Sequence, residues 1–221
     1  MKPYFVDDRA GITIFLGDCM EIVPSLPNVD LVIADPPYEL TATGGGIGAK
    51  RQYLKDITGF TDGGFDDSIL DGFSNWFVFC SKGQLIKLLQ KASVRRWMLV
   101  NWVKPNPTPL CNGNYLPDTE YIVHSFEPNR CFGEFRDKSR FILYPAQQSL
   151  LHPNEKPLEV IGKLIRLGSQ VSETILDPYM DSGTTLRAAK DLGRKAIGIE
   201  IEEKYCEIAA KRLAQEVFEF S

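Results

Sequence analysis

The chain has 221 residues, of which 43% are apolar and 24% charged, and its formal net charge is −4. This length fits a single domain, residues 1–221, that can bury a core without disulfides or metals, and the negative charge argues against coating nucleic acid through bulk electrostatics. No apolar run approaches the roughly 18 residues of a membrane span, and the start, "MKPYFVDDRAG", lacks the apolar segment of a signal peptide. We therefore expect a cytoplasmic protein without membrane association. The cysteines are scattered, so we expect no metal site.

Short apolar runs alternate along the chain with segments of helical periodicity. The predicted strands are 12–16, 29–34, 76–80, 97–103, 121–124, 140–144, 174–176 and 195–199, and the predicted helices are 82–91, 158–167, 184–191 and 203–216. The runs "VDLVIA" and "KAIGIEI" are continuously apolar, as in strands covered on both faces. This alternation predicts an α/β fold with a mostly parallel, doubly wound sheet. Closely spaced runs between residues 121 and 144 suggest an antiparallel edge.

Residues 39–67 form a glycine-rich, polar segment that is longer than an ordinary connection. Connections of this length are usually functional or disordered. The stretch "GGGIGAK" resembles a phosphate-binding loop only superficially, because the adjacent Gly-Lys-Ser/Thr is missing and no suitable strand precedes it. We therefore assign this segment no nucleotide-phosphate site.

The stretch "VDLVIADPPYEL" places an acid at the end of a buried strand, where open α/β sheets bind ligands. Asp35 is followed by Pro36 and Pro37, which fix two φ angles and remove two backbone donors. The result is a stiff corner with a carboxylate, acceptor carbonyls and the ring of Tyr38. Such a corner suits a planar ligand that carries an amino group.

Four further segments place polar groups near the ends of predicted strands or the starts of helices. "FLGDC" ends in Asp18 and Cys19, and "HPNEKP" places His152 and Lys156 before a helix, where an anion can be held. "DPYMDSGTT" supplies hydroxyls and backbone N–H groups at a strand-to-helix turn. Glu200 ends the last strand, where a carboxylate can bind both hydroxyls of a ribose.

Together and in this order, DPPY, HPxxKP, DPxxxSGTT and GRxxIGIE resemble the amino-group DNA methyltransferases of the β arrangement, and the resemblance covers residues 17–213. In that family the DPPY motif precedes the cofactor-binding motifs, a circularly permuted order. The resemblance implies a Rossmann-like methyltransferase fold, S-adenosylmethionine as cofactor with S-adenosylhomocysteine as product, and a target base flipped out of double-stranded DNA. It also implies a bacterial or phage-encoded enzyme, either restriction-paired or solitary.

The resemblance also implies roles for individual residues. Asp35 and the Pro36 carbonyl would accept hydrogen bonds from the exocyclic amino group, Pro37 would complete the corner, and Tyr38 would stack on the flipped base. Asp18 and Cys19 would lie at the adenine, Glu200 at the ribose, and His152 and Lys156 at the methionine carboxylate. Along the methionine half would be Asp177, Ser182, Gly183, Thr184 and Thr185, with Asp181 beside it. Tyr179 and Asp35 would also belong to the cofactor site.

The target base is adenine or cytosine. In the family an acidic first residue before Pro-Pro-Tyr is associated more often with adenine N6 and a serine with cytosine N4, so Asp35 favours adenine. N4-cytosine methylation is one alternative. A catalytically inactive DNA-binding regulator on the same fold is another.

Two segments are predicted to contact DNA. The first is the target-base loop, residues 39–67, and the second is a small target-recognition insertion, residues 125–151. The predicted DNA-binding residues are Lys50, Arg51, Tyr53, Lys104, Arg130, Arg136, Lys138 and Arg140. Because the insertion is small for reading a long site alone, we expect a homodimer that shares a near-palindromic site.

Asp181 stands where the family pattern has glycine. The turn can require φ > 0, and Asp is among the non-glycine residues that best tolerate that conformation. We therefore expect an active enzyme in which this extra carboxylate alters, and weakens, cofactor binding.

Overall fold

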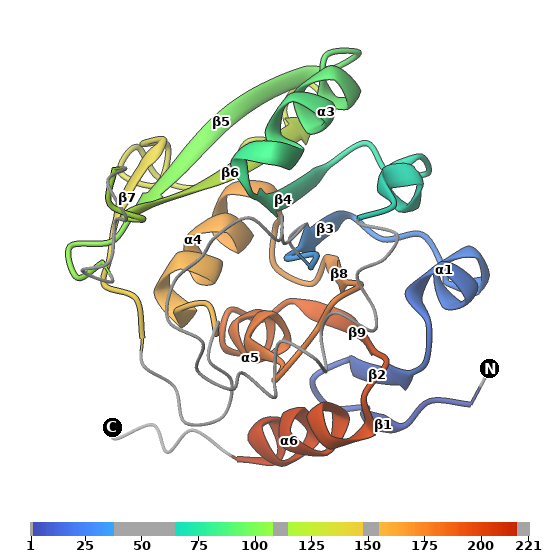
Figure 1. The fold of residues 1–221 in the computed structure, drawn as a ribbon. Coiled ribbons are helices and arrows are strands. Elements are labelled where there is room, and N and C mark those ends of the chain that lie inside the picture. The colour runs from blue at the N-terminus through green and yellow to red at the C-terminus, as the bar shows by residue number, and fades with distance from the viewer. Residues whose placement is uncertain (1, 38–64, 108–114, 148–154, 216–221) are drawn as a thin grey trace, which may run out of the picture.

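A computed structural model describes residues 2–37, 65–107, 115–147 and 155–215. Its centre is a nine-stranded sheet in the order β1-β2-β9-β8-β3-β4-β6-β5-β7 (Figure 1). The strands are β1 Phe5–Asp7, β2 Ile12–Leu16, β3 Leu31–Ala34, β4 Trp76–Cys80, β5 Arg96–Val103, β6 Thr119–Phe126, β7 Phe141–Leu143, β8 Thr174–Asp177 and β9 Lys195–Glu200. Only β1 and β6 run against the other strands of this sheet.

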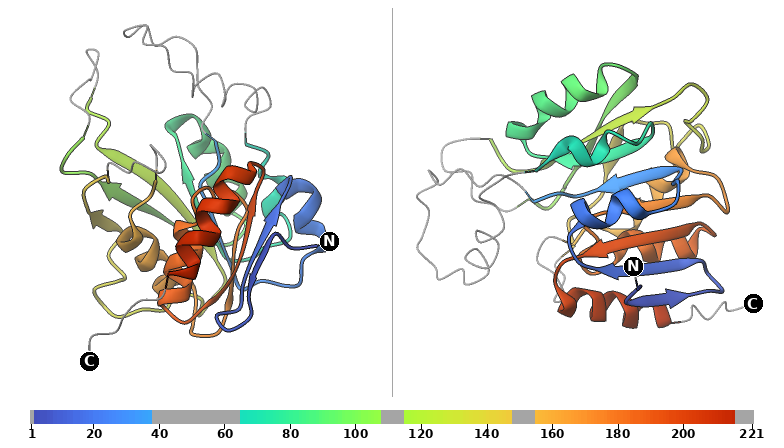
Figure 2. Two further views of the ribbon diagram at one scale, coloured as in Figure 1. Left: turned by 90° about the horizontal axis from the view of Figure 1, so that it is seen from below. Right: turned by 90° about the vertical axis from the view of Figure 1, so that its right-hand side faces the viewer.

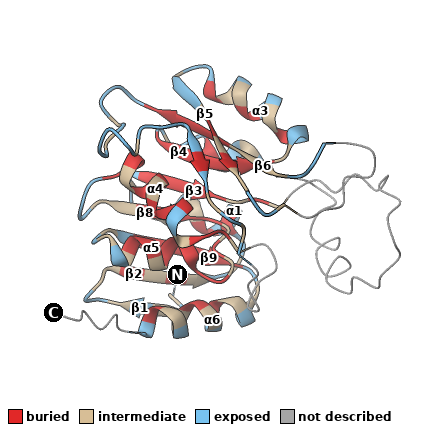
Figure 3. Ribbon diagram, turned by 90° about the vertical axis from the view of Figure 1, so that its left-hand side faces the viewer, coloured by how far each residue is buried: buried red, intermediate tan, exposed pale blue. Residues whose placement is uncertain are grey.

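Helices cover both faces of the sheet. The helical segments are α1 Cys19–Ile22, η1 Val23–Ser25, η2 Asp67–Leu70, α3 Lys82–Ala92, α4 Leu158–Gly168, α5 Thr184–Asp191 and α6 Glu203–Ala214. One core packs α4, α5 and α6 against one face, and the other packs α1, η2 and α3 against the opposite face. The central strands are therefore buried on both sides, as Figure 3 shows. Among the described residues no helix is long and apolar enough to cross a membrane.

Alternation along the strands divides their side chains between the two cores. In β3, Leu31 and Ile33 pack toward α4, whereas Val32 and Ala34 pack toward the other face. This alternation follows from the two-residue repeat of a strand. Both sets are apolar, and this explains why the run in the sequence is continuous rather than alternating.

The predicted α/β fold with a mostly parallel sheet is confirmed, and each predicted strand and helix is present within a few residues of its expected bounds. The antiparallel pairing lies at β6, between β4 and β5, and the outermost strand, β7, runs parallel to β5. Four short elements, β1, α1, η1 and η2, were not predicted. Each has only three or four residues, too few to show a periodic pattern.

Candidate active site

Four charged side chains lie in a row along the carboxyl edge of the sheet, on the face that α4 covers. They are Asp177 at the end of β8, Asp35 after β3, Glu120 in β6 and Lys104 after β5. Each lies two residues along the chain from a residue of the α4-side core: Ile175, Ile33, Ile122 and Trp102. Because alternate residues of a strand share a face, this spacing brings the four charges to one side of one edge.

Lys156 lies above this row, just before α4. Its Nζ is 2.5 Å from Oδ2 of Asp35 and 3.4 Å from Oε2 of Glu120, and 5.1 Å from the ring centroid of Phe79. Burial opposes the charge of this ammonium, but Asp35 and Glu120 outweigh burial, so the pKa of Lys156 is raised. Lys156 is therefore a permanent cation next to Asp35, the predicted catalytic acid.

The turn between β8 and α5 holds a second group of acids. Asp181 has a φ of 48°, so this turn does place a non-glycine residue in the left-handed region. Its backbone N–H donates to Oε2 of Glu200 at 3.0 Å, and the N–H of Glu202 donates to Oε1 at 2.8 Å. Two backbone donors thus fix the Glu200 carboxylate at the end of β9, next to the turn.

Gly183 begins α5 with a φ of 81°. A Cβ on this residue would lie 2.7 Å from Cβ of Ala209 in α6, so the turn can pass this point only without a side chain. Beside it, the hydroxyl of Thr184 donates to Oε1 of Glu155 at 3.2 Å. Nη1 of Arg212 lies 2.5 Å from the same oxygen and ties α6 to this turn.

The acids of this site resist ionisation in the absence of a cation. Burial raises the pKa of Asp177 to about 7, against hydrogen bonds from Thr185 and the N–H of Tyr179. Burial and the neighbouring carboxylates raise the pKa of Asp181 well above its ordinary value, and burial raises that of Glu200. A buried acidic cluster of this kind favours a cationic ligand, because opposite charge restores the ionised forms. The sulfonium and ammonium of S-adenosylmethionine fit this requirement.

The predicted adenine end of the site is built differently from the methionine end. The carboxylate of Asp18 accepts from the N–H of Met20 at 2.8 Å and caps α1. Cys19 is buried, and burial raises the pKa of its thiol, which shares a hydrogen bond with Tyr179. The ring of Tyr179 packs edge-on against Phe65 at 6.0 Å. This end of the site is therefore lined by less polar groups, which suits a purine ring.

The structure brings together the predicted residues Asp35, Lys156, Asp177, Asp181 and Glu200, and the carboxyl edge also carries the remaining described cofactor residues. Those are Asp18, Cys19, Tyr179, Ser182, Gly183, Thr184 and Thr185. Tyr38, Lys50, Arg51, Tyr53 and His152 lie outside the described residues.

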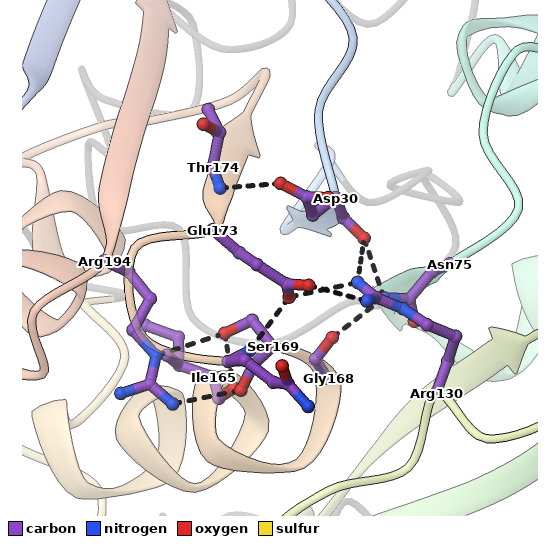
Figure 4. Close-up of polar contacts among 10 residues, drawn as sticks. Asp30, Asn75, Arg130, Ile165, Gly168, Ser169, Glu173, Thr174 and Arg194 are labelled. Carbon is purple, nitrogen blue, oxygen red and sulfur yellow. Dashed lines mark hydrogen bonds and ion pairs between the residues drawn. The ribbon is translucent and has the colours of Figure 1, made fainter.

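Residues 127–139 of the predicted recognition segment lie at the end of the sheet opposite Asp35, and β7 then runs parallel to β5, back toward the carboxyl edge. In the right-hand view of Figure 2 these residues follow β6 at the end of the sheet opposite the one toward which β3 points. Arg130 pairs with both carboxylate oxygens of Glu173 at 2.7 and 3.1 Å and donates to the carbonyl of Asp30 at 3.0 Å (Figure 4). Asp30 and Glu173 precede β3 and β8, so Arg130 fastens the amino edge of the sheet.

The chain after Arg130 continues along the same side of the sheet before it enters β7. Phe132 donates its N–H to the carbonyl of Leu167 at the end of α4, and Arg140 immediately precedes β7. The structure therefore does not bring Arg130, Arg136, Lys138 and Arg140 to the edge that carries Asp35. Lys104 does lie at that edge, where it forms an ion pair with Glu120.

Sequence reasoning did not assign site roles to Glu120, Glu155 and Arg212. The alternation of side chains along a strand could have indicated Glu120, because it lies two residues before Ile122, a core residue of the predicted strand 121–124. Glu155 and Arg212 come together from distant parts of the chain, and no local pattern indicates that contact.

No group of three or more potential metal ligands occurs in the part of the chain that the structure describes. His124 is stacked on Phe77 with ring centroids 3.7 Å apart, and burial lowers its pKa to about 3. It is therefore a neutral core residue.

Comparison with known proteins gives one family. The model of the N6/N4 methyltransferase family, described as "DNA methylase", matches residues 29–211. The type II methyltransferase M2.MboI of Moraxella bovis is 27% identical over 252 residues, covering 96% of this chain and 91% of its own. M.HinfI of Haemophilus influenzae, also a type II methyltransferase, is 27% identical, with 92% of this chain and 68% of its own covered.

Solved structures agree with this match. The crystal structure of the M1.HpyAVI–SAM complex has a TM-score of 0.69 at 26% identity, covering 92% of this chain and 100% of its own. The cytosine-N4-specific PvuII DNA methyltransferase has a TM-score of 0.68 at 17% identity, covering 97% of this chain and 90% of its own, a likeness of fold alone.

The fold, with its acidic site at the carboxyl edge, therefore defines a Rossmann-like methyltransferase. The chain belongs to the N6/N4 DNA methylase family. It is an amino-group DNA methyltransferase whose cofactor is S-adenosylmethionine.

Proposed function

We propose that the protein methylates the N6 amino group of adenine at a specific site in double-stranded DNA. The observation that carries the proposal is the position of Asp35. This acid ends β3 beside the acidic turn of Asp177 and Asp181, and the following Pro36 and Pro37 leave backbone carbonyls without competing N–H donors. An acid at the first position of this motif supports adenine over cytosine.

The residues of the corner act on the amino group of the base. An exocyclic amino nitrogen is a weak nucleophile because its lone pair is delocalised into the ring. Hydrogen bonds to Asp35 and to the Pro36 carbonyl favour a nitrogen whose lone pair is available. S-adenosylmethionine supplies an electrophilic methyl group on a sulfonium sulfur, which keeps the electron pair of the broken C–S bond. The nitrogen that gains the methyl group becomes positively charged, and Asp35 stabilises this charge until one N–H proton passes to solvent.

Glu200 and the α5 turn support the cofactor rather than the base. Glu200, fixed by two backbone N–H groups, is suited to the ribose hydroxyls. Asp177 suits the cationic methionine half, since its raised pKa falls again when a cation binds. We propose that Tyr38 stacks on the flipped base, as its position after Pro37 suggests.

The test is methyl transfer from labelled S-adenosylmethionine to unmodified DNA, followed by mass spectrometry of the nucleosides. We expect N6-methyladenine, lost in Asp35→Ala and kept in the control Asp191→Ala, whose carboxylate pairs with Arg187 at the surface of α5. N4-methylcytosine would replace the adenine assignment. Absence of any transfer by the native chain would favour a DNA-binding regulator.

We also propose that two copies act together on one near-palindromic site and that residues 39–67 and 125–151 serve as the base loop and recognition insertion. The small size of the insertion supports the dimer. We also propose that the protein is the DNA-modifying enzyme of a restriction-modification system or a solitary methyltransferase, and the relatives named as type II methyltransferases support this. Sedimentation that finds a monomer both free and on DNA would refute the dimer.

A further inference from the structure

A chain of alternating charges runs along the active-site edge and ends at the catalytic acid. Lys104 pairs with Oε1 of Glu120, and Oε2 of Glu120 lies 3.4 Å from Nζ of Lys156. Nζ of Lys156 lies 2.5 Å from Oδ2 of Asp35. Only the last of these contacts touches a group that meets the base, and the resemblance assigns Lys156 to the cofactor instead.

The surroundings of Lys156 restrict where its ammonium can go. The side chain is 7% exposed, and the ring of Phe79 lies below the ammonium at 5.1 Å. The acids that face it come from three elements: Asp35 after β3, Glu120 in β6, and Asp181 in the turn before α5. A buried ammonium needs such partners, because unpaired it would carry a large desolvation cost.

We propose that Lys156 is a positioning residue for Asp35, and that Glu120, held by Lys104, keeps Lys156 in place. This inference rests on the proposed function. The ammonium fixes the orientation of the Asp35 carboxylate and favours its ionised form. A carboxylate has about four acceptor sites, so it can accept from Lys156 and from a base amino group together. Because Lys156 is shared with Glu120, it orients Asp35 without cancelling its charge completely.

This role differs measurably from binding of the cofactor carboxylate. A lysine that binds the cofactor affects mainly the KM for S-adenosylmethionine. A lysine that positions Asp35 affects kcat and its pH profile, because Asp35 acts on the amino group during transfer. The two roles can therefore be separated by steady-state kinetics.

The experiment compares Lys156→Met, Glu120→Gln and the double variant with the native chain, over pH 5 to 9. We expect Lys156→Met to lower kcat about 100-fold, as for a misplaced catalytic group, with the KM for S-adenosylmethionine unchanged. The acidic limb of the kcat profile should move to higher pH, because Asp35 loses the cation that favours its ionised form. Glu120→Gln should lower kcat less.

The double variant tests whether Glu120 acts through Lys156. If it does, Glu120→Gln should add nothing to Lys156→Met, since groups that act through one another are not additive. The matched control is Lys190→Met, which breaks a comparable ion pair, 2.7 Å from Asp7, in a region away from the site. We expect the control to keep native kcat, KM and pH profile.

A Lys156→Met variant that raises only the KM for S-adenosylmethionine would overturn the proposal. If thermal unfolding shows that Lys156→Met does not fold, Glu120→Gln decides, because glutamine keeps the shape of the side chain. A native kcat and a native pH profile in Glu120→Gln would also overturn the proposal. A native chain that transfers no methyl group to DNA would remove the proposed function itself, whatever the variants do.

Discussion

Replacing Asp177 with asparagine removes a buried charge from the centre of the acidic site while keeping an acceptor oxygen. In the native protein Oδ1 of Asp177 accepts from the N–H of Tyr179 at 3.0 Å, which an asparagine Oδ1 can also do. The side chain is 5% exposed, and burial raises its pKa from 3.8 to about 7. The variant therefore isolates the effect of the charge.

The sign of the effect follows from proton linkage. Between pH 4 and 7 the folded state keeps a proton on Asp177 that the unfolded state has lost, so native stability falls as the pH rises through this window and the loss is complete above pH 7. A pKa rise of about three units corresponds to about 4 kcal/mol at ~1.4 kcal/mol per unit. We expect Asp177→Asn to be about 2–4 kcal/mol more stable than the native chain at pH 8, since the site relaxes around the charge, and equally stable near pH 4.

Urea unfolding of both proteins at pH 4, 6 and 8 measures this difference. The free energies of unfolding should separate progressively with pH, and saturating S-adenosylmethionine should reduce the gap, because its positive charge stabilises the ionised Asp177. A difference that does not change between pH 4 and pH 8 would refute the reasoning about burial. A gap that the cofactor leaves untouched would refute the proposed cation site.

Four further substitutions test other parts of the structure. Asp181→Gly should tighten binding of S-adenosylmethionine up to about tenfold, or about 1.4 kcal/mol, in calorimetry at pH 7, because it removes a side chain from the turn and a carboxyl that can repel the methionine carboxylate of the cofactor. In thermal unfolding, Gly183→Ala should destabilise the fold by about 2–4 kcal/mol. Gly193 also has a positive φ, but a Cβ there would lie 3.6 Å from Cγ1 of Val171, an ordinary contact, so Gly193→Ala should destabilise the fold by only about 1–2 kcal/mol. Arg130→Gln should lower stability by about 1–3 kcal/mol and leave the KM for DNA unchanged.

Each of these expectations has a result that contradicts it. An unchanged dissociation constant in Asp181→Gly would show that the extra carboxyl does not affect the cofactor. Equal losses in Gly183→Ala and Gly193→Ala would show that the contact with α6 is not limiting. A raised KM for DNA in Arg130→Gln would return that residue to the DNA-binding surface.

The order of strands and helices was predictable because each long element carries a periodic or continuously apolar pattern. The buried strands before Asp35 and Glu200 were predicted from their apolar runs. The sequence also indicated a turn at Asp181 that can require a positive φ, and the structure gives a φ of 48° there. The pairing of strands was less accessible: nothing local indicates that β6 inserts between β4 and β5. That insertion is what places Glu120 within reach of Lys156.

The path of the chain after β6 was also beyond local reasoning. A basic and aromatic stretch is compatible with DNA contact, and Arg130 was therefore predicted to bind DNA. Its partners, Asp30 and Glu173, lie 100 and 43 residues away in the sequence. Only the strand order brings both to one edge, so the ion pair could not be read from composition.

The left-handed turn at Asp181 has an evolutionary consequence. Aspartate and glycine codons differ at a single nucleotide, and both residues tolerate the φ of 48° that the turn requires. The loop can therefore exchange an acidic side chain for none in one mutational step, without rebuilding its backbone or releasing Glu200. We predict that this single step changes how strongly the enzyme binds its methyl donor.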